Sequence, residues 1–262
     1  MQLISARARH GTARRDPVWT RTILVVAVAT LAYGCGGDAI NGPGQSALSG
    51  TLSLQDVWGN NLDDFSGVTV SVEGLTASAV TDKAGVWKID GLVPGRYDIT
   101  LKKDAFGTMR IFDQPVVGAS SVTPTIAMAR TATHQAIVDS VRVGTLSGTE
   151  FYFIDGHFSA PPPANAKASV AVVFLSTKGE SVSSDPASYQ QWNASIGLSA
   201  SATFTMALPV DGTRSTFGQG VTIFVAGYAS SVACSCYTDP TTKNRVFSNA
   251  GPRGNVVRFT VK

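Results

Sequence analysis

The sequence has few of the side chains that catalysis most often uses. Of its 262 residues, three are histidine, three are cysteine and 15% are charged. It contains no Gly-x-Ser-x-Gly nucleophile elbow, no His-Glu-x-x-His motif and no glycine-rich phosphate loop. We therefore predict a protein that is not an enzyme and that holds no metal and no cofactor.

A long hydrophobic run is also absent. The apolar segment near the N-terminus extends only from Thr22 to Tyr33, whereas a membrane-crossing helix needs about 20 apolar residues. It ends at Gly34-Cys35 and follows five arginines, at positions 7, 9, 14, 15 and 21. A basic region before a short apolar run is typical of a secretory signal. The alternative is an uncleaved membrane anchor, which the short run and the Gly34-Cys35 pair disfavour.

The residues around Cys35 resemble the lipobox of bacterial lipoproteins, in which small residues precede a cysteine that becomes lipidated. The resemblance implies that residues 1–34 are a signal peptide and that Cys35 receives diacylglycerol and an N-acyl chain. We therefore expect an exported, membrane-anchored lipoprotein, on the outer membrane or cell surface or in the periplasm. Residues 35–46 are rich in glycine, which predicts a flexible tether behind the anchor.

The chain lacks a strong positive charge once the signal segment is set apart. Its formal net charge is +3, and residues 1–34 hold five arginines against Asp16, so that about −1 is left for the remainder. The remaining charges are interspersed in sign. This balance excludes the basic surface that a nucleic-acid partner requires.

Apolar side chains after residue 47 alternate with polar ones instead of recurring at helical spacing. In residues 68–73, for example, three valines alternate with threonine, serine and glutamate. Such alternation predicts half-buried antiparallel strands. The composition, rich in valine, threonine, serine and glycine, agrees with it. The length beyond residue 34 suffices for two cores, so we predict an all-β fold with two tandem β-sandwich domains.

Residues 81–101 combine turn and strand signals. Asp82 is expected to accept hydrogen bonds from the amides of a turn in which Gly85 supplies a positive φ. The following strand should point Trp87 into the core. Pro94-Gly95 fits the two central positions of a type II turn, which would bring the chain into the next strand.

This combination resembles the carboxypeptidase regulatory-like domain, a transthyretin-like sandwich. The resemblance rests on a Thr-Asp turn, a glycine, an aromatic residue and Gly-Leu-x-Pro-Gly-x-Tyr, and it covers roughly residues 47–129. It implies a seven-stranded, non-catalytic domain of the carbohydrate-binding-like fold. The matched positions build turns and core, so that no functional residue follows from them.

A second β-sandwich is predicted for residues 134–262, because residues 129–133 show no strand pattern. Its expected strands are residues 151–154, 170–175, 204–208, 221–228 and 256–261. Residues 170–175 are apolar at consecutive positions, which indicates a central strand covered on both sides. The last strand resembles that of an immunoglobulin-like or fibronectin-like sandwich.

Aromatic side chains in loops are the candidates for ligand contact. Trp58 lies in a turn rich in glycine and asparagine, and Trp192 lies near Tyr189. A large ring can stack on the apolar face of a sugar, and loops often carry function. Ordinary packing is the competing interpretation for each of them. The acids around Trp58 do not have the spacing of a calcium loop, so a solvated turn is favoured there.

Two cysteines remain after Cys35, namely Cys234 and Cys236. Residues i and i+2 of an extended strand lie about 6–7 Å apart, so a disulfide between them needs a turn. In an oxidising compartment we favour that disulfide, with free thiols as the alternative. The pair lacks the further ligands of a zinc site.

The histidines do not assemble a catalytic site. Asp155 and His157 share one strand face, where a polar pair at a strand edge is the favoured interpretation over an acid/base pair. The sequence thus predicts a non-catalytic binding or scaffolding lipoprotein with carbohydrate as the leading ligand. The alternatives are an adhesin or assembly subunit that binds another surface protein, and a hydrolase with an unrecognised site.

Overall fold

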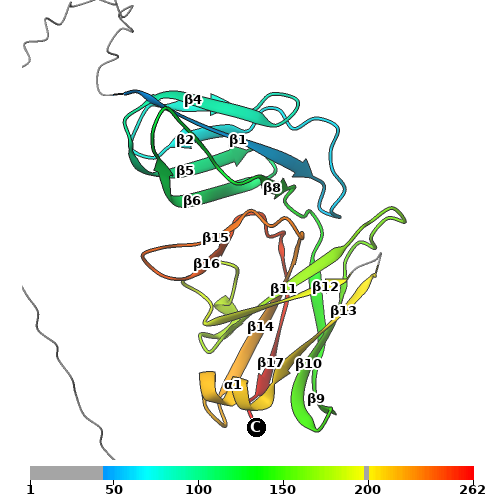
Figure 1. Ribbon diagram of the computed structural model, residues 1–262. Coiled ribbons are helices and arrows are strands. Elements are labelled where there is room, and N and C mark those ends of the chain that lie inside the picture. Colours follow the sequence, from blue (N-terminus) through cyan, green and yellow to red (C-terminus); the bar gives the residue numbers. More distant parts are fainter. Residues whose placement is uncertain (1–43, 198–200) are drawn as a thin grey trace, which may run out of the picture. The chain divides into compact units, whose positions relative to one another are not determined.

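The structure is a computed structural model that describes residues 44–197 and 201–262. The predicted signal peptide, the predicted lipidation site Cys35 and most of the predicted tether lie outside the described residues. In the part described, no helix has the length and apolar character needed to cross a membrane. The fold is all-β, as the alternation predicted, and consists of tandem β-sandwiches (Figure 1).

The first sandwich is formed by two sheets. One has the order β4-β1-β7, with β8 also pairing with β1, and the other has the order β3-β2-β5-β6. The strands are β1 Ser46–Gln55, β2 Thr69–Val72, β3 Ser78–Val80, β4 Val86–Leu92, β5 Gly95–Lys103, β6 Gly107–Val116, β7 Ser120–Val122 and β8 Ile126–Ala129. Strand β1 pairs antiparallel with β4 and parallel with β7 and β8.

The core of this sandwich follows from the period of two. On β2 and β5, Val70, Val72, Ile99 and Leu101 are buried, while the polar residues between them point outward. Trp87 is the largest fully buried side chain of the chain's described part. Its ring lies against Gly50, where an added Cβ would come within 2.7 Å of Cζ2. Glycine at position 50 therefore makes room for the tryptophan.

The predicted turn at residues 82–85 is present in the structure. The side chain of Asp82 accepts a hydrogen bond from the amide of Val86 (2.9 Å), and Gly85 has a φ of +79°. The prediction for Pro94-Gly95 was wrong in one respect. Gly95 already belongs to β5 without a positive φ, and Gly91 at the end of β4 adopts +79° instead. The connection between β4 and β5 is therefore Val93-Pro94, one residue earlier than the Pro-Gly pair indicated.

The second sandwich also has two main sheets, of orders β13-β10-β9 and β12-β11-β14-β17, with a small sheet of β15 and β16. The elements are β9 Ala136–Leu146, β10 Thr149–Phe158, β11 Ser169–Ser176, the 3-10 turn Gly179–Ser181, β12 Gln191–Gly197, β13 Thr203–Pro209, α1 Val210–Phe217, β14 Thr222–Ser230, β15 Cys236–Thr238, β16 Arg245–Phe247 and β17 Arg253–Thr260. Each of the five predicted strands matches one of these.

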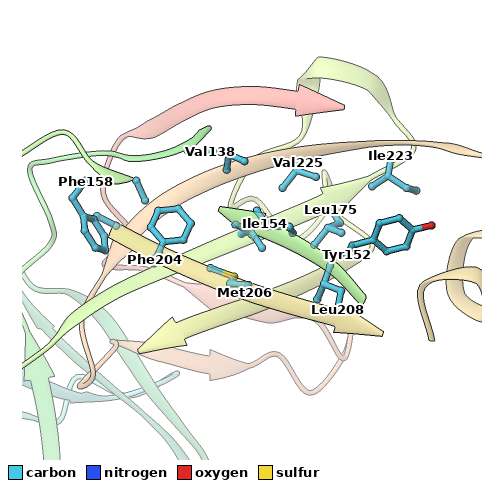
Figure 2. Packing of buried hydrophobic residues seen from close by; sticks show 14 of the residues in the cluster. Val138, Tyr152, Ile154, Phe158, Leu175, Phe204, Met206, Leu208, Ile223 and Val225 are labelled. Carbon is cyan, nitrogen blue, oxygen red and sulfur yellow. The ribbon is translucent and has the colours of Figure 1, made fainter. Parts of the chain in front are cut away.

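Figure 2 shows the core between the two main sheets, with Phe158 and Phe204 packed together (ring centroids 5.6 Å apart) and Met206 beside them. Every residue of β11 is buried, as expected for a strand covered on both sides. On the outer side, β11 is covered by a separate hydrophobic cluster around Phe174, Tyr228 and Phe247. The small β15–β16 sheet therefore closes the outer face of the larger sheet.

Helix α1 was not foreseen. It is a single short helix after β13, anchored by the buried Val210 and Thr213, and the hydroxyl of Thr213 donates to the carbonyl of Pro209 (2.9 Å). A helix of eight residues repeats its apolar face too few times for periodicity to reveal it.

Polar contacts join the two sandwiches. The hydroxyl of Ser235 donates to the carbonyl of Phe106 (2.7 Å), and the amide of Thr108 donates to the hydroxyl of Ser248 (3.0 Å). The side-chain amide of Asn249 reaches the carbonyl of Ala129 (3.4 Å). We call these contacts the junction. They place β15 next to β6, where the candidate site lies.

Candidate functional site

The candidate site lies on the outer surface of the sheet β3-β2-β5-β6, which continues onto β15. We call this surface the polar face. It is composed of hydroxyl, charged and aromatic side chains that point away from the core, namely Thr69, Ser71, Glu73, Thr100, Lys102, Arg110, Phe112 and Tyr237. On β2 and β5 these residues alternate with buried residues of the core.

An ion pair with fixed geometry lies at the centre of the polar face. The Arg110 guanidinium donates through Nε to Glu73 Oε1 (2.7 Å) and through Nη2 to Glu73 Oε2. The hydroxyl of Thr100 donates to Oε1 as well (2.6 Å). The hydrogen bond from Arg110, followed by that from Thr100, lowers the pKa of Glu73. Glu73 thus stays ionised and held in one orientation on a partly exposed surface.

Two aromatic rings flank the ion pair. The guanidinium carbon of Arg110 lies 4.6 Å from the ring centroid of Phe112 and 5.7 Å from that of Tyr237. The two rings meet edge to face, with centroids 5.8 Å apart. Both rings are partly exposed. The site therefore presents apolar ring surface directly beside charged hydrogen-bonding groups.

A shallow groove extends the polar face beyond the ion pair, along β2 and β5. It has a volume of about 600 Å³ and is lined by hydroxyl groups and by charged groups, among them Thr69, Ser71, Thr100, Lys102 and Asp104. Lys103, at the rim, donates to the carbonyl of Ser66. A polar ligand could thus find donors and acceptors along the groove and a ring surface at its end.

The structure separates the aromatic residues that the sequence singled out. Trp192 is 39% exposed on β12 and packs edge to face on Phe247 (5.0 Å). Tyr189 is buried against Phe174, and its hydroxyl donates to the carbonyl of Arg245. The two therefore lie in one aromatic cluster, of which Trp192 forms the exposed rim.

Trp58 lies in a different place and faces a histidine. Its ring stacks on that of His134, with centroids 4.5 Å apart, and His134 in turn meets Phe158 edge to face. The carbonyl of Trp58 accepts the amides of Lys167 and Ala168. Trp58 is thus partly covered and fixed in position. His134 lies in the segment between β8 and β9, not on a strand.

Because His134 is buried among aromatic rings, its pKa is lowered. The unfolded chain therefore binds this proton at a higher pH than the folded chain, and stability falls as the pH drops through about 6.5. We expect urea unfolding to show a lower free energy at about pH 6 than at about pH 8. The variant His134→Phe should show a flatter profile in this window, whereas an unchanged slope would contradict the assignment.

The structure joins Cys234 and Cys236 by a disulfide, with a Cα–Cα distance of 5.1 Å. The ring that it closes contains Ser235, the residue that donates to Phe106 at the junction. Arg245 Nη2 contacts the sulfur of Cys236 at 3.0 Å. The described residues contain no group of three potential metal ligands.

Asp155 and His157 do share the outer face of β10, but they do not pair with each other. His157 Nδ1 contacts Asp139 (2.9 Å), while Asp155 accepts from Arg142 (2.7 Å) and from the hydroxyl of Thr205 (2.8 Å). Arg142 also stacks over Phe153, 4.5 Å from the ring centroid. These are separate ion pairs and hydrogen bonds on a sheet surface, and Asp155 and His157 do not form an acid/base pair.

Sequence reasoning missed Arg110, Phe112 and Tyr237. Alternation did place Thr69, Ser71 and Glu73 on the solvent side, and a second period-two stretch at residues 110–112 carries the signal for Arg110 and Phe112. Tyr237 could not be predicted from local sequence, because only the junction places it next to β6.

The chain is only remotely similar to known proteins. No protein-family model matches the sequence, and no curated protein matches it either. A cohesin–X-dockerin complex of Acetivibrio cellulolyticus matches with 24% identity and a TM-score of 0.29 over 33% of this chain and 58% of that chain. The chain thus corresponds to little more than half of that structure's length.

Two further structures match over most of this chain. One is a proposed carbohydrate-binding protein of Bacteroides uniformis, with 12% identity and a TM-score of 0.27 over 82% of this chain and 98% of that chain. The other is the major pilin SpaD of Corynebacterium diphtheriae, with 12% identity and a TM-score of 0.26 over 82% and 67%. TM-scores this low carry nothing about ligand or partner. By its own fold and site, the chain is a tandem β-sandwich protein with a polar, aromatic-flanked surface.

Proposed function

We propose that the protein is a non-catalytic binding module of the cell envelope and that it binds carbohydrate on the polar face. The observation that carries the proposal is the Glu73–Arg110 ion pair set beside the rings of Phe112 and Tyr237. Vicinal sugar hydroxyls match charged planar groups that can donate and accept at fixed positions. The apolar face of a pyranose matches an exposed ring.

A glycan array probed with the purified full-length chain tests the proposal. Binding to one class of glycan is expected, and it should be lost when Phe112 and Tyr237 are both changed to alanine. The matched control is Phe153→Ala, because Phe153 also stacks under an arginine on a sheet surface but lies on the second sandwich, away from the polar face. The carbohydrate proposal fails if no glycan binds, or if Phe153→Ala is as harmful as the double variant.

The membrane anchor is a separate part of the proposal. It rests on the sequence around Cys35, so its test is the distribution of Cys35→Ala between membrane and soluble fractions. The variant is expected to leave the membrane fraction, and an unchanged distribution would refute lipidation at Cys35. The resemblance of residues 47–129 to the carboxypeptidase regulatory-like domain is likewise proposed, with the Asp82–Gly85 turn in its support.

One observation favours an adhesin or assembly subunit as the second candidate. Trp192 and Ile196 are 39% and 52% exposed and project from the same side of β12, which is an edge strand. An apolar row at a sheet edge suits a protein partner. Under this alternative, Ile196→Asp should abolish complex formation with another surface protein while glycan binding stays absent.

A further inference from the structure

Strand β1 enters the first sandwich at one of its ends, and the pairing of the strands defines which turns lie there. Ser46 pairs with Leu92, and Ala47 pairs with Ser120. Gly95 pairs with Val116, and the amide of Glu73 bonds to the carbonyl of Asp98. The turns at residues 73–77, 93–94 and 117–119 therefore lie at the end where β1 begins. We call this the entry end.

Each of these three turns presents one exposed aliphatic side chain. Leu75 is 51% exposed, Val93 is 63% exposed and Val117 is 64% exposed. The other large aliphatic side chains that the described part of this sandwich exposes, Val80, Val86 and Val122, lie on strands and not on turns. Single exposed aliphatic residues are ordinary on a protein surface. Their placement on every turn of one end is what distinguishes this end.

Two of the turns, at residues 93–94 and 117–119, border an open depression. It has a volume of about 1180 Å³ and is bordered by Ser46, Lys88, Val93, Pro94 and Gly118. Val93 and the turn after Val117 thus stand on opposite sides of a hollow. Separate aliphatic tips around a hollow lined by both polar and apolar groups fit a surface in which such groups also meet, such as lipid headgroups above acyl chains.

The charged groups at the entry end neutralise one another. Lys88 pairs with Asp90 (2.7 Å), and Arg96 pairs with Asp113 through two nitrogens. Asp98 accepts the amide of Asp113 (2.9 Å) and adds a negative charge. Attraction to an anionic lipid surface is therefore excluded as the cause of contact, and apolar insertion remains.

The length of the chain before β1 limits how far the entry end can move from the anchor. From Cys35 to Ser46 the chain can extend at most about 36–40 Å. Strand β1 itself has ten residues and adds about 33 Å to the opposite end of the sandwich. The entry end is thus the part of the first sandwich that the anchor keeps closest to the bilayer, which gives it the highest effective concentration there.

From these observations we infer that Leu75, Val93 and Val117 insert into the headgroup region of the phospholipid bilayer that carries the anchor. The inference rests on the proposed lipidation of Cys35. Docking would hold the first sandwich upright on the membrane and would direct the second sandwich away from it. Because the paired charges contribute no net attraction and Asp98 adds a negative charge, anionic lipid should not strengthen the contact.

The test uses the lipidated full-length chain in phosphatidylcholine vesicles that contain a brominated lipid. Single cysteines are introduced as Val93→Cys, Val117→Cys and, as the control, Leu146→Cys at the tip of the β9–β10 hairpin, which is 55% exposed. With Cys35 lipidated and Cys234 bonded to Cys236, only the new thiol reacts with an environment-sensitive dye. Dye at positions 93 and 117 is expected to shift to the blue and to be quenched, whereas dye at position 146 should report water.

Equal signals at all three positions, or quenching at only one of positions 93 and 117, overturn the docking inference. The anchor is checked independently by the mass of lipid on Cys35 in the same preparation. A chain without lipid refutes the anchor and the inference with it, while a lipidated chain with unquenched dye refutes docking alone. A further variant, Val93→Asp in the Val117→Cys chain, should restore the water-like signal, and Val122→Asp on the β7 surface should not.

Discussion

The variant Arg110→Ala is expected to lower carbohydrate affinity by about 10- to 100-fold, since a hydrogen bond to a charged group contributes about 1.5–3 kcal/mol. The substitution removes the guanidinium that holds Glu73 and that packs on Phe112 and Tyr237. Glu73 then loses both its orientation and a partner. The measurement is isothermal titration calorimetry with the glycan that binds best on the array.

The matched control for this prediction is Arg142→Ala. Arg142 makes the same set of contacts on the second sandwich, with a carboxylate that also accepts a threonine hydroxyl and with a phenylalanine ring beneath it. It lies on the sheet β13-β10-β9, away from the polar face, so its removal should leave the affinity unchanged. Equal losses in the two variants would contradict the assignment of the polar face. Both arginines are on the surface, so both variants should retain the fold.

Trp87→Ala is expected to destabilise the first sandwich by about 3–5 kcal/mol, because it leaves a large cavity in a core that relaxes only in part. Trp87 is fully buried and lies against Gly50, which has no side chain to move into the space. Urea unfolding followed by far-ultraviolet circular dichroism measures the loss. A change below about 1 kcal/mol would show that the core does not depend on this ring.

Trp87→Phe serves as the control and separates the ring from its polar atom. The indole nitrogen of Trp87 is buried without a hydrogen-bond partner. An unpaired buried donor costs about 1–3 kcal/mol, so replacing the indole with an apolar ring offsets part of the lost area. Trp87→Phe should therefore retain most of the stability that Trp87→Ala loses.

Much of the fold could be predicted because sandwich strands carry their burial in alternate residues. Residues 68–73 and 170–175 show the two kinds of strand clearly, one half-buried and one covered on both sides. Strand β9 was missed: its burial alternates only at Ala136–Val138, and none of its later residues is buried. The other missed elements have a weaker signal still. Strand β12 is an edge strand with mixed exposure, and β15 and β16 have three residues each.

The candidate site was less predictable than the fold, since it depends on distance in space. Trp58 and Trp192 were singled out for their local sequence, yet each ring is held by packing against His134 or Phe247. The polar face combines residues of three strands of one sheet with Tyr237 from another sheet. No local sequence pattern marks these residues as a site, because they come together only through the register between strands.

The junction gives the polar face a mechanical property. Phe112 belongs to the first sandwich and Tyr237 to the second, so a ligand that contacts both rings spans the two bodies. Ligand binding and the association of the two sandwiches are then thermodynamically coupled, so that each strengthens the other by the same free energy. A weakened junction, as in Ser235→Ala, should lower affinity without touching the ligand. Conversely, a bound ligand would hold the two sandwiches together, so that a force pulling them apart would have to displace the ligand before they could separate.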